Sequence, residues 1–322
     1  MENALGTDVG SATREGTGGL ARPDAAAGPT EPETRTARFF AVVDGDDPSV
    51  RSRRLGAYEF NLALIVVVEY WLRAIPKWGL LAGHYDVLLG LATFAGLTIV
   101  ATRFRRSGFA LLAVAHAVLV TTEFPSTGNH AYLELILCAL AAFLDRNDAA
   151  QGRLYLQTLR WVVVVVLFYS GLQKLVQGHW VRAEFLAFSV ATESFRNVLA
   201  PLLSPVELAR LAALRGEVGD GPYHAASLSL RIVANATWIA EIALGPALCW
   251  RRSRAVALAI TLLLLAAIEV GAREVFFGLV FANAILSFAH RDLHSLSRPI
   301  VVGLLALLAL SRLGVIPEAT FY

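Results

Sequence analysis

Long apolar runs, separated by short polar segments, dominate the chain from about residue 58 to residue 316. Most of these runs approach the roughly 20 residues with which a helix crosses about 30 Å of hydrocarbon. Because backbone groups in lipid must satisfy one another, helix is the structure that such runs predict. The predicted spans, about nine, are roughly residues 58–75, 85–102, 108–124, 131–144, 155–176, 230–250, 255–272, 274–289 and 299–316.

Two segments differ from this pattern. Residues 1–37 are rich in Gly, Ala, Thr, Pro and Glu without periodicity and contain no apolar signal-like run, which predicts a disordered cytoplasmic tail before a membrane domain over 38–322. Residues 177–229 form a long segment between two spans. Within it, Ser204, Pro205 and Glu207 form a capping-box pattern before an amphipathic helix. That helix is expected either on the outer membrane surface or packed over the bundle as a lid.

Arginines occupy every second loop between the predicted spans. This alternation follows the positive-inside rule, so it places the N-terminus inside and the C-terminus outside. It also puts segment 177–229 on the outer side. The arginines of the inner side are Arg51, Arg53, Arg54, Arg103, Arg105, Arg106, Arg146, Arg153, Arg160, Arg251, Arg252, Arg254, Arg291 and Arg298.

Composition agrees with a membrane protein. The chain is 56% hydrophobic and 17% charged, whereas soluble domains carry about 25% charged residues. A net charge of +2 gives no reason to expect a nucleic acid as partner. Cys138 and Cys249 lie inside apolar runs, so we expect buried packing residues and neither a disulfide framework nor a zinc site. The predicted fold class is all-α, a polytopic membrane helical bundle.

Ionisable residues inside membrane spans are costly and usually face the protein interior or a cavity. With the orientation above, most of them fall in the outer halves of their spans, and Glu241 falls near the middle. This clustering predicts a polar cavity that opens outward beneath segment 177–229. The residues of the outer halves are Glu69, Arg73, Glu123, His130, Glu134, Lys174, Glu269 and Arg273.

Several of these residues also have a purely structural interpretation. Glu69 and Arg73 are four residues apart, as are Glu269 and Arg273, and each pair can be a plain ion pair. His116 is expected to be a packed, hydrogen-bonded histidine. Asn235, Trp238 and Glu241 share one helix face, where an interhelical hydrogen bond and a ligand contact are both open.

His130, Glu134 and Lys174 are the strongest functional candidates. His130 and Glu134 stand four residues apart, so the carboxylate can orient the imidazole. A lysine in an apolar pocket can act as a base, although Lys174 can also extend to the outer interface. We therefore expect Lys174, His130 and Glu134 to approach one another.

Two stretches resemble a known family. Gly128-Asn129-His130-Ala131-Tyr132-Leu133 resembles the N-H-x-Y-L element of the vitamin K-dependent gamma-carboxylases. Phe168-Tyr169-Ser170-Gly171-Leu172-Gln173-Lys174-Leu175, followed by Trp180, resembles the Y-F-x-A-G-x-x-K-L and tryptophan element of the same family. The wider family is the horizontally transferred transmembrane (HTTM) domain, and the resemblance covers about residues 50–316.

The resemblance implies quinol chemistry. The family's lysine, matched by Lys174, deprotonates reduced vitamin K, and the oxygenated quinone then removes a γ-proton from glutamate so that carbon dioxide can add. His130 matches a supporting catalytic residue, and Asn129 matches the asparagine beside it. The carboxylase has paired lysines, whereas Gln173 precedes Lys174 here. The residues expected to bind the quinol, reduced vitamin K or menaquinol, are Asn129, Tyr169, Trp180, Trp238 and Glu241.

The leading hypothesis is thus a multi-pass enzyme of a bacterial plasma membrane, a carboxylase-like lyase or oxidoreductase whose site faces outside. Lys174 is its general base, with His130, oriented by Glu134, in support. The family's large substrate-gripping domain has no counterpart before Tyr322. A smaller substrate, a separate protein that supplies substrate recognition, and other quinol chemistry are therefore all open. A non-catalytic scaffold or lipid-binding protein is the alternative. A transporter or proton pathway using the glutamates is a third, against which the lack of broken-helix repeats argues.

Overall fold

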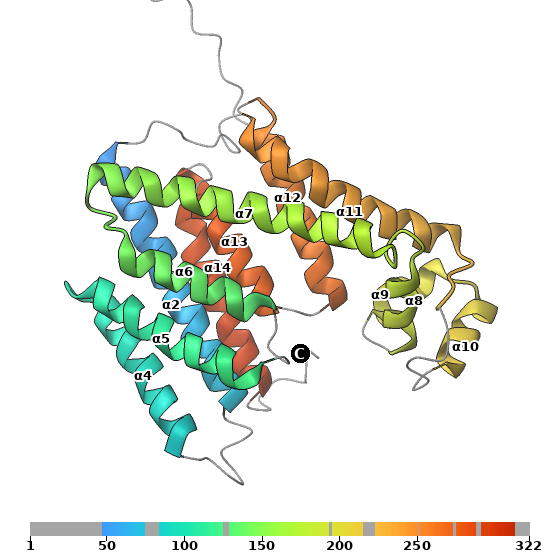
Figure 1. Ribbon diagram of the computed structural model, residues 1–322, viewed down its shortest axis with the longest axis horizontal. Coiled ribbons are helices and arrows are strands. Elements are labelled where there is room, and N and C mark those ends of the chain that lie inside the picture. The colour runs from blue at the N-terminus through green and yellow to red at the C-terminus, as the bar shows by residue number, and fades with distance from the viewer. Residues whose placement is uncertain are drawn as a thin grey trace, which may run out of the picture. The chain divides into compact units, whose positions relative to one another are not determined.

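The computed structural model of the protein describes residues 47–74, 84–124, 129–192, 195–214, 223–250, 252–272, 275–287 and 291–312. Within these ranges every regular element is a helix (Figure 1). The predicted tail, residues 1–37, lies outside the described residues. The elements are α2 (Pro48–Ala74), α4 (His84–Val100), α5 (Arg105–Glu123), α6 (Asn129–Phe143), α7 (Ala149–Gln177), α8 (Glu184–Ala191), α9 (Arg196–Leu199), η2 (Ala200–Leu202), α10 (Pro205–Ala213), α11 (Leu228–Cys249), α12 (Arg254–Ala272), α13 (Val275–Ser287) and α14 (Arg291–Arg312).

Each predicted apolar segment coincides with one helix, so the all-helical prediction is confirmed for the described residues. Three helices are long and apolar enough to cross a membrane, over Pro48–Leu72, Ala149–Gln177 and Leu228–Cys249. These three helices make the chain a candidate membrane protein. The count of nine spans and the inside position of the N-terminus remain predictions. The shorter apolar helices are Leu89–Val100, His130–Phe143, Arg254–Ile268, Val275–Ser287 and Ser297–Leu310.

Helix α2 occupies the interior of the bundle. Leu55, Tyr58, Leu62 and Ile65 recur at helical spacing and are fully buried. The helix packs against α4, α6, α7, α13 and α14. In the most apolar 18-residue stretch of α2, 61% of the residues are buried, against 28% in the corresponding stretches of α7 and α11. Helix α2 therefore forms the core, while α7 and α11 keep broad apolar faces exposed.

Helices α7 and α11 run side by side (Figure 1) and have the most extensive contact of any helix pair in the described residues. Two glycines permit the approach. A Cβ atom on Gly171 would lie 2.8 Å from the Trp238 carbonyl oxygen and 2.8 Å from Ile242, and one on Gly245 would lie 3.1 Å from Phe168. Small residues at such crossings let membrane helices pack backbone to backbone. This packing fixes the register between Lys174 of α7 and the residues of α11.

Buried amides connect α2 to α13. The Asn61 side chain donates to the Asn283 side-chain oxygen at 3.1 Å, and Asn283 donates to the backbone carbonyl of Tyr58 at 2.9 Å. Both asparagines are buried. Interhelical hydrogen bonds of this kind specify which helix faces meet in a bundle that lipid surrounds.

Helices α8, α9 and α10 form a small second core with the start of α11. Leu186, Leu211 and Leu230 are among its buried side chains. The predicted start of α10 is confirmed, because Ser204 is the N-cap and accepts from the Glu207 backbone N–H at 3.2 Å. The Glu207 carboxylate accepts from the N–H of Ala226 at 2.6 Å, next to the start of α11. Packing against α8 thus accounts for the apolar face of α10.

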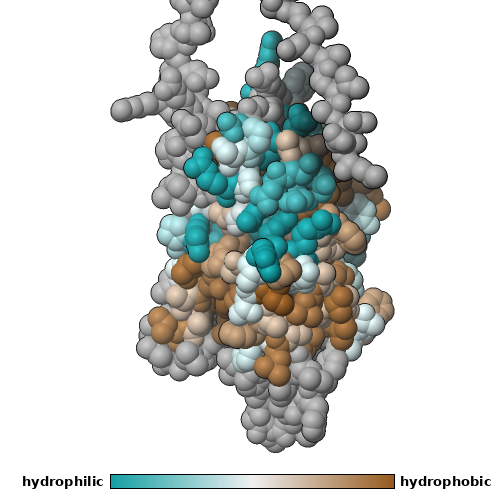
Figure 2. Space-filling view, turned by 90° about the vertical axis from the view of Figure 1, so that its left-hand side faces the viewer, coloured by the Kyte–Doolittle hydropathy of each residue, from teal (hydrophilic) through white to brown (hydrophobic). Residues whose placement is uncertain are grey.

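Polar and apolar residues separate on the molecular surface. Figure 2 shows one face on which hydrophilic residues gather above a hydrophobic region. A membrane boundary would produce such a division. Cys138 is buried as predicted, but the prediction for Cys249 is wrong because its side chain is exposed. It is the last residue of α11, where the helix leaves its packing partners.

Candidate functional site

The clearest polar site lies between α7 and α11, around Lys174. Its Nζ donates to both carboxylate oxygens of Glu241, each at 2.6 Å, and to the Ser170 hydroxyl at 2.8 Å. The Glu241 side chain is 4% exposed and that of Lys174 is 17% exposed. A carboxylate is therefore buried behind a cation that still reaches the edge of the protein.

The local sequence explains how this pair forms. Ser170 lies one turn before Lys174 on α7, so its hydroxyl points along the helix to the ammonium group. Gly171 brings the α11 backbone against α7 beside Glu241, whose Cβ would lie 2.9 Å from a Cβ on Gly171. A larger residue at position 171 would separate the helices and with them the two charges.

A tight turn after α7 returns an aromatic ring to Lys174. Gly178 ends the helix with φ of 73°, and Ala183 adopts φ of 59° before α8 begins. Between them, the Trp180 ring stacks on Phe185, with centroids 4.9 Å apart. Lys174 Nζ lies 4.9 Å from the centroid of the Trp180 ring, within the range of a cation–π interaction.

The same turn carries a second carboxylate. Glu184 accepts from Arg182 Nε at 2.6 Å and contacts His179 Nδ1 at 3.0 Å. The Arg182 hydrogen bond, with help from His179, lowers the pKa of Glu184 to about 2, against the opposing effect of burial. This cluster holds the turn that positions Trp180, while its two basic side chains remain mostly exposed.

The other candidate site residues on α7 and α11 have different surroundings. Asn235 donates to the Val181 carbonyl at 3.0 Å and accepts from the Trp238 indole at 2.9 Å. These contacts connect α11 to the Trp180 turn. Tyr169 is 64% exposed on α7, so it belongs to the surface next to Lys174.

His130 and Glu134, the other two catalytic candidates, contact α2 and α5. His130 Nε2 lies 2.9 Å from Glu69 Oε1. Glu134 Oε2 lies 2.7 Å from His116 Nε2, which gives His116 the polar partner that the sequence did not reveal. The expected interaction of Glu69 with Arg73, and the side chain of Asn129, lie outside what the structure describes.

Lys174, Glu241 and Trp180 thus come together as one site. His130 and Glu134 belong to a set of histidine–carboxylate pairs with Glu69 and His116. The contacts described here do not link the two groups, and the predicted approach of Lys174 to His130 stays a prediction.

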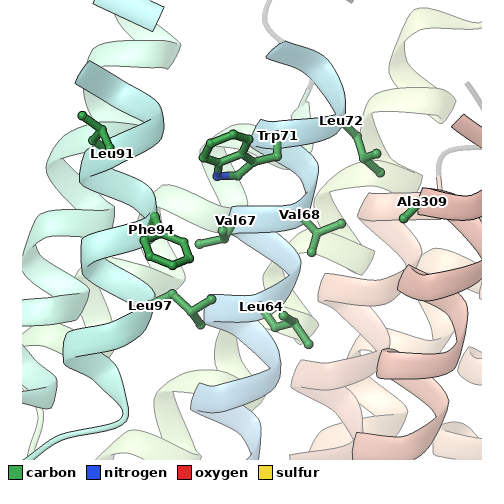
Figure 3. Close-up of a pocket in the computed structure, with 9 residues that line it drawn as sticks. All are labelled: Leu64, Val67, Val68, Trp71, Leu72, Leu91, Phe94, Leu97 and Ala309. Carbon is green, nitrogen blue, oxygen red and sulfur yellow. The ribbon is translucent and has the colours of Figure 1, made fainter. Parts of the chain in front are cut away.

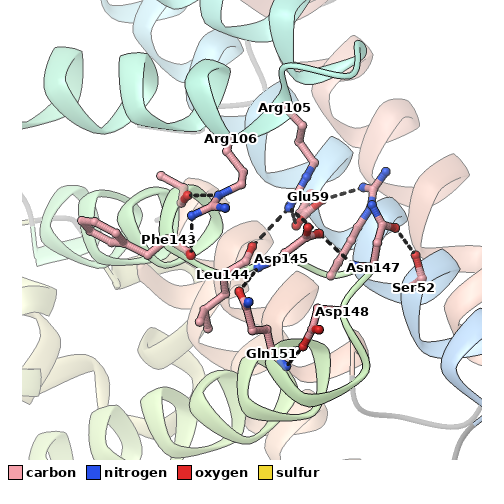
Figure 4. Close-up of polar contacts among 12 residues, drawn as sticks. Ser52, Glu59, Arg105, Arg106, Phe143, Leu144, Asp145, Asn147, Asp148 and Gln151 are labelled. Carbon is pink, nitrogen blue, oxygen red and sulfur yellow. Dashed lines mark hydrogen bonds and ion pairs between the residues drawn. The ribbon is translucent and has the colours of Figure 1, made fainter.

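Sequence reasoning missed a charged cluster around Glu59 (Figure 4). The Glu59 side chain is fully buried and pairs with Arg105 and, at 2.6 Å, with Arg146. Arg105 also lies 3.7 Å from Asp145. The signal in the sequence was the position of Glu59, a carboxylate at the arginine-rich end of the first apolar run.

Arginines at this end also bind backbone carbonyl groups. Arg106 donates to the carbonyl of Phe143 at 2.9 Å, and Arg105 donates to that of Leu144 at 3.1 Å (Figure 4). Arg51 donates to the carbonyl of Ala149 at 2.9 Å. The first three arginine-rich loops therefore meet at one end of the bundle, which is the arrangement that the positive-inside prediction requires.

A separate apolar cavity of about 550 Å³ lies between α2, α4 and α14 (Figure 3). Its side chains come from all three helices and carry no charge. The residues that line it are Leu64, Val67, Val68, Trp71, Leu72, Leu91, Phe94, Leu97 and Ala309. Neither Lys174 nor Glu241 contributes to this cavity, so it is a second and chemically different site.

Among the described residues, no group of three or more His, Cys, Asp or Glu side chains is arranged to hold a metal ion. No family model matches the chain, no curated protein matches it, and no solved structure matches it.

Proposed function

We propose that the protein is an integral membrane enzyme whose Lys174–Glu241 pair exchanges a proton with a lipid quinol at the outer side of the membrane. The observation that supports this most is the geometry of the pair. An ammonium group 2.6 Å from a buried carboxylate forms a unit in which a proton can pass from nitrogen to oxygen. The resemblance to the carboxylase-like membrane domain points to the same lysine.

The pair changes how the lysine would work. Lys174 is not a lone base, because its ammonium already donates to Glu241. Transfer of that proton to Glu241 frees the amine, which can then take a proton from a hydroxyl group at the exposed side. The O–H bond breaks, a new N–H bond forms, and the net proton resides on Glu241.

The surroundings of the pair fit a quinol. Trp180 offers a flat aromatic face beside Lys174, and exposed Tyr169, Leu172 and Val176 give an apolar surface for a lipid tail. When bound, a quinol supplies an acidic hydroxyl group and reducing equivalents for oxygen. In this proposal, His130 and Glu134 remain supporting residues. If the substrate is a protein, a separate protein recognises it.

Turnover by the purified protein in lipid nanodiscs tests this function. With reduced vitamin K or menaquinol and oxygen, the native protein should form quinone or epoxide. The variant Lys174→Met with Glu241→Leu should form none, since both proton-exchanging groups are gone while the volume is kept. The matched control is Asp145→Asn, which changes a carboxylate at the arginine end. Equal turnover by native protein and double variant would contradict the proposal.

A second candidate function is a lipid-binding scaffold, which the apolar cavity favours. Cavities of a few hundred Å³ with apolar walls suit a hydrocarbon chain. Filling the space with Ala309→Trp should reduce the lipid that co-purifies with the protein, measured by native mass spectrometry. If native protein shows no quinol turnover and Ala309→Trp loses bound lipid, the scaffold is the better description.

A further inference from the structure

Buried titratable side chains follow the seam between α2 and α6. On α6, His130, Glu134 and Cys138 stand four residues apart and form one stripe, with side chains about 5–6 Å apart at Cβ. On α2, Tyr58 and Glu69 are eleven residues apart, which places them on one face about three turns from each other. All except His130 are at most 2% exposed.

Contacts at the first end of this stripe are short. His130 lies 2.9 Å from Glu69, and Glu134, one turn further along α6, lies 2.7 Å from His116. The His130 side chain is 16% exposed, whereas that of Glu134 is fully buried. This end therefore leads from the protein edge into the core.

The stripe continues through the middle of the bundle. Cys138 lies one turn beyond Glu134 on α6 and packs in the same buried cluster as Tyr58 and Tyr155. The ring of Tyr58 meets that of Tyr155 of α7 edge to face, with centroids 6.1 Å apart. Glu59 directly follows Tyr58 on α2 and is also fully buried.

The second end is the arginine cluster of Figure 4. Glu59 is held there by Arg105 and Arg146, and the Arg146 side chain is 28% exposed. Arginine does not give up its proton in proteins, so it cannot relay one. The two guanidinium groups instead hold the Glu59 carboxylate where solvent approaches this end.

The Tyr58 hydroxyl is the most informative member of the stripe. It is buried and has no hydrogen-bond partner in the described part of the chain. Burying an unbonded hydroxyl destabilises a fold, and phenylalanine would fill the same space without that cost. A hydroxyl in this position needs another explanation than packing.

We propose that the column formed by Glu69, His130, Glu134, Cys138, Tyr58, Tyr155 and Glu59, with His116 beside Glu134, is a proton path between the two ends of the bundle. Carboxylic acid, imidazole, thiol and phenol groups can each accept a proton at one lone pair and donate one. A proton that enters at one end displaces another at the far end, with no electron transferred. Chains of such groups inside membrane bundles typically serve proton movement.

Proton flux in proteoliposomes tests this path. Native protein is reconstituted with the dye pyranine inside, and a potassium gradient with valinomycin drives proton entry. Flux should exceed that of protein-free liposomes. Tyr58→Phe should lower the protein-dependent flux about tenfold, because losing the phenol that accepts and donates the proton raises the barrier of one transfer step, and a tenfold slower step corresponds to about 1.4 kcal/mol. Glu134→Gln should reduce the flux to the protein-free background.

Matched controls separate the path from general damage. Tyr132→Phe changes a more exposed tyrosine of α6, and Cys249→Ala changes the exposed cysteine, so both should keep native flux. Tyr58→Phe removes a single unbonded hydroxyl and should fold like native protein. Native flux in well-folded Tyr58→Phe, or native flux no higher than that of empty liposomes, would overturn the proposal. Quinol turnover by the Lys174 site is measured independently of this flux.

Discussion

Two buried carboxylates, Glu59 and Glu241, are neutralised in different ways. Glu59 pairs with two arginines, and one of these, Arg105, is itself fixed to a backbone carbonyl. Glu241 faces a single flexible lysine that also contacts a hydroxyl and an aromatic ring. The arginine cluster joins loops that are distant in the chain, whereas the lysine can change partners.

The difference follows from side-chain chemistry. Guanidinium groups are planar, always charged and able to bind a carboxylate and a carbonyl together, so they suit a fixed junction. An ammonium group is a compact donor at the end of a flexible chain, and it can give up its proton. We therefore expect the Glu59 cluster to hold the loops together, and we propose the Lys174–Glu241 pair as the site for quinol chemistry.

Glu59→Gln should have the largest effect on stability. It leaves Arg105 and Arg146 without their buried countercharge, and breaking a buried pair by removing one partner costs about 3–5 kcal/mol. Thermal unfolding in detergent should show a large fall in midpoint. A midpoint near that of native protein would mean that the cluster does not support the fold.

Lys174→Met should have the next largest effect, because it leaves the Glu241 carboxylate buried alone. We expect a loss near the lower end of the range for broken buried pairs, about 3 kcal/mol. Adding Glu241→Leu should recover most of that loss, since apolar replacement of both partners is often neutral. Chemical or thermal unfolding of the three proteins measures this. A double variant as unstable as the single one would show that the pair itself stabilises the helix contact.

Glu184 extends the comparison to a carboxylate outside the three candidate spans. Because Arg182 lowers its pKa from 4.5 to about 2, the charged form is the stabilising one. This contribution is fully present above about pH 4.5 and is lost as the pH falls towards 2. The stability difference between native protein and Glu184→Gln should therefore shrink over that interval. A stability difference that does not depend on pH would show that the charged contact with Arg182 does not stabilise the fold.

Asp145→Asn should have the smallest effect. Asp145 lies 3.7 Å from Arg105 and its side chain is 38% exposed, and exposed ion pairs contribute about 0–1 kcal/mol. Its unfolding midpoint should stay close to the native value. A loss of stability as large as that of Glu59→Gln would show that Asp145, and not Glu59, holds the arginine-rich loops together.

The sequence predicted the helices well because apolar runs of nearly spanning length leave the backbone one choice in lipid. The Ser204 cap was equally local and was confirmed. Long-range partners could not be predicted in this way. Lys174 and Glu241 are 67 residues apart, and their meeting depends on the rotation and register of two helices.

The predicted orientation of His130 by Glu134 shows the same limit. His130 and Glu134 are neighbours on one helix because they are four residues apart. The structure also places Glu69 beside His130 and His116 beside Glu134. The Glu59 cluster was missed because its arginines lie in two other loops. Local patterns identify the residues that lipid penalises, and only the packed helices show which of them pair.

Quinol turnover by Lys174→Arg tests the central claim most directly. Arginine keeps the positive charge opposite Glu241, so the fold and the ion pair should persist, but a guanidinium group does not release its proton. If the pair performs proton exchange, Lys174→Arg should fold like native protein and form no quinone or epoxide under conditions in which native protein does. Turnover equal to that of native protein would show that only the charge of Lys174 is needed and would contradict the proposed role as a base.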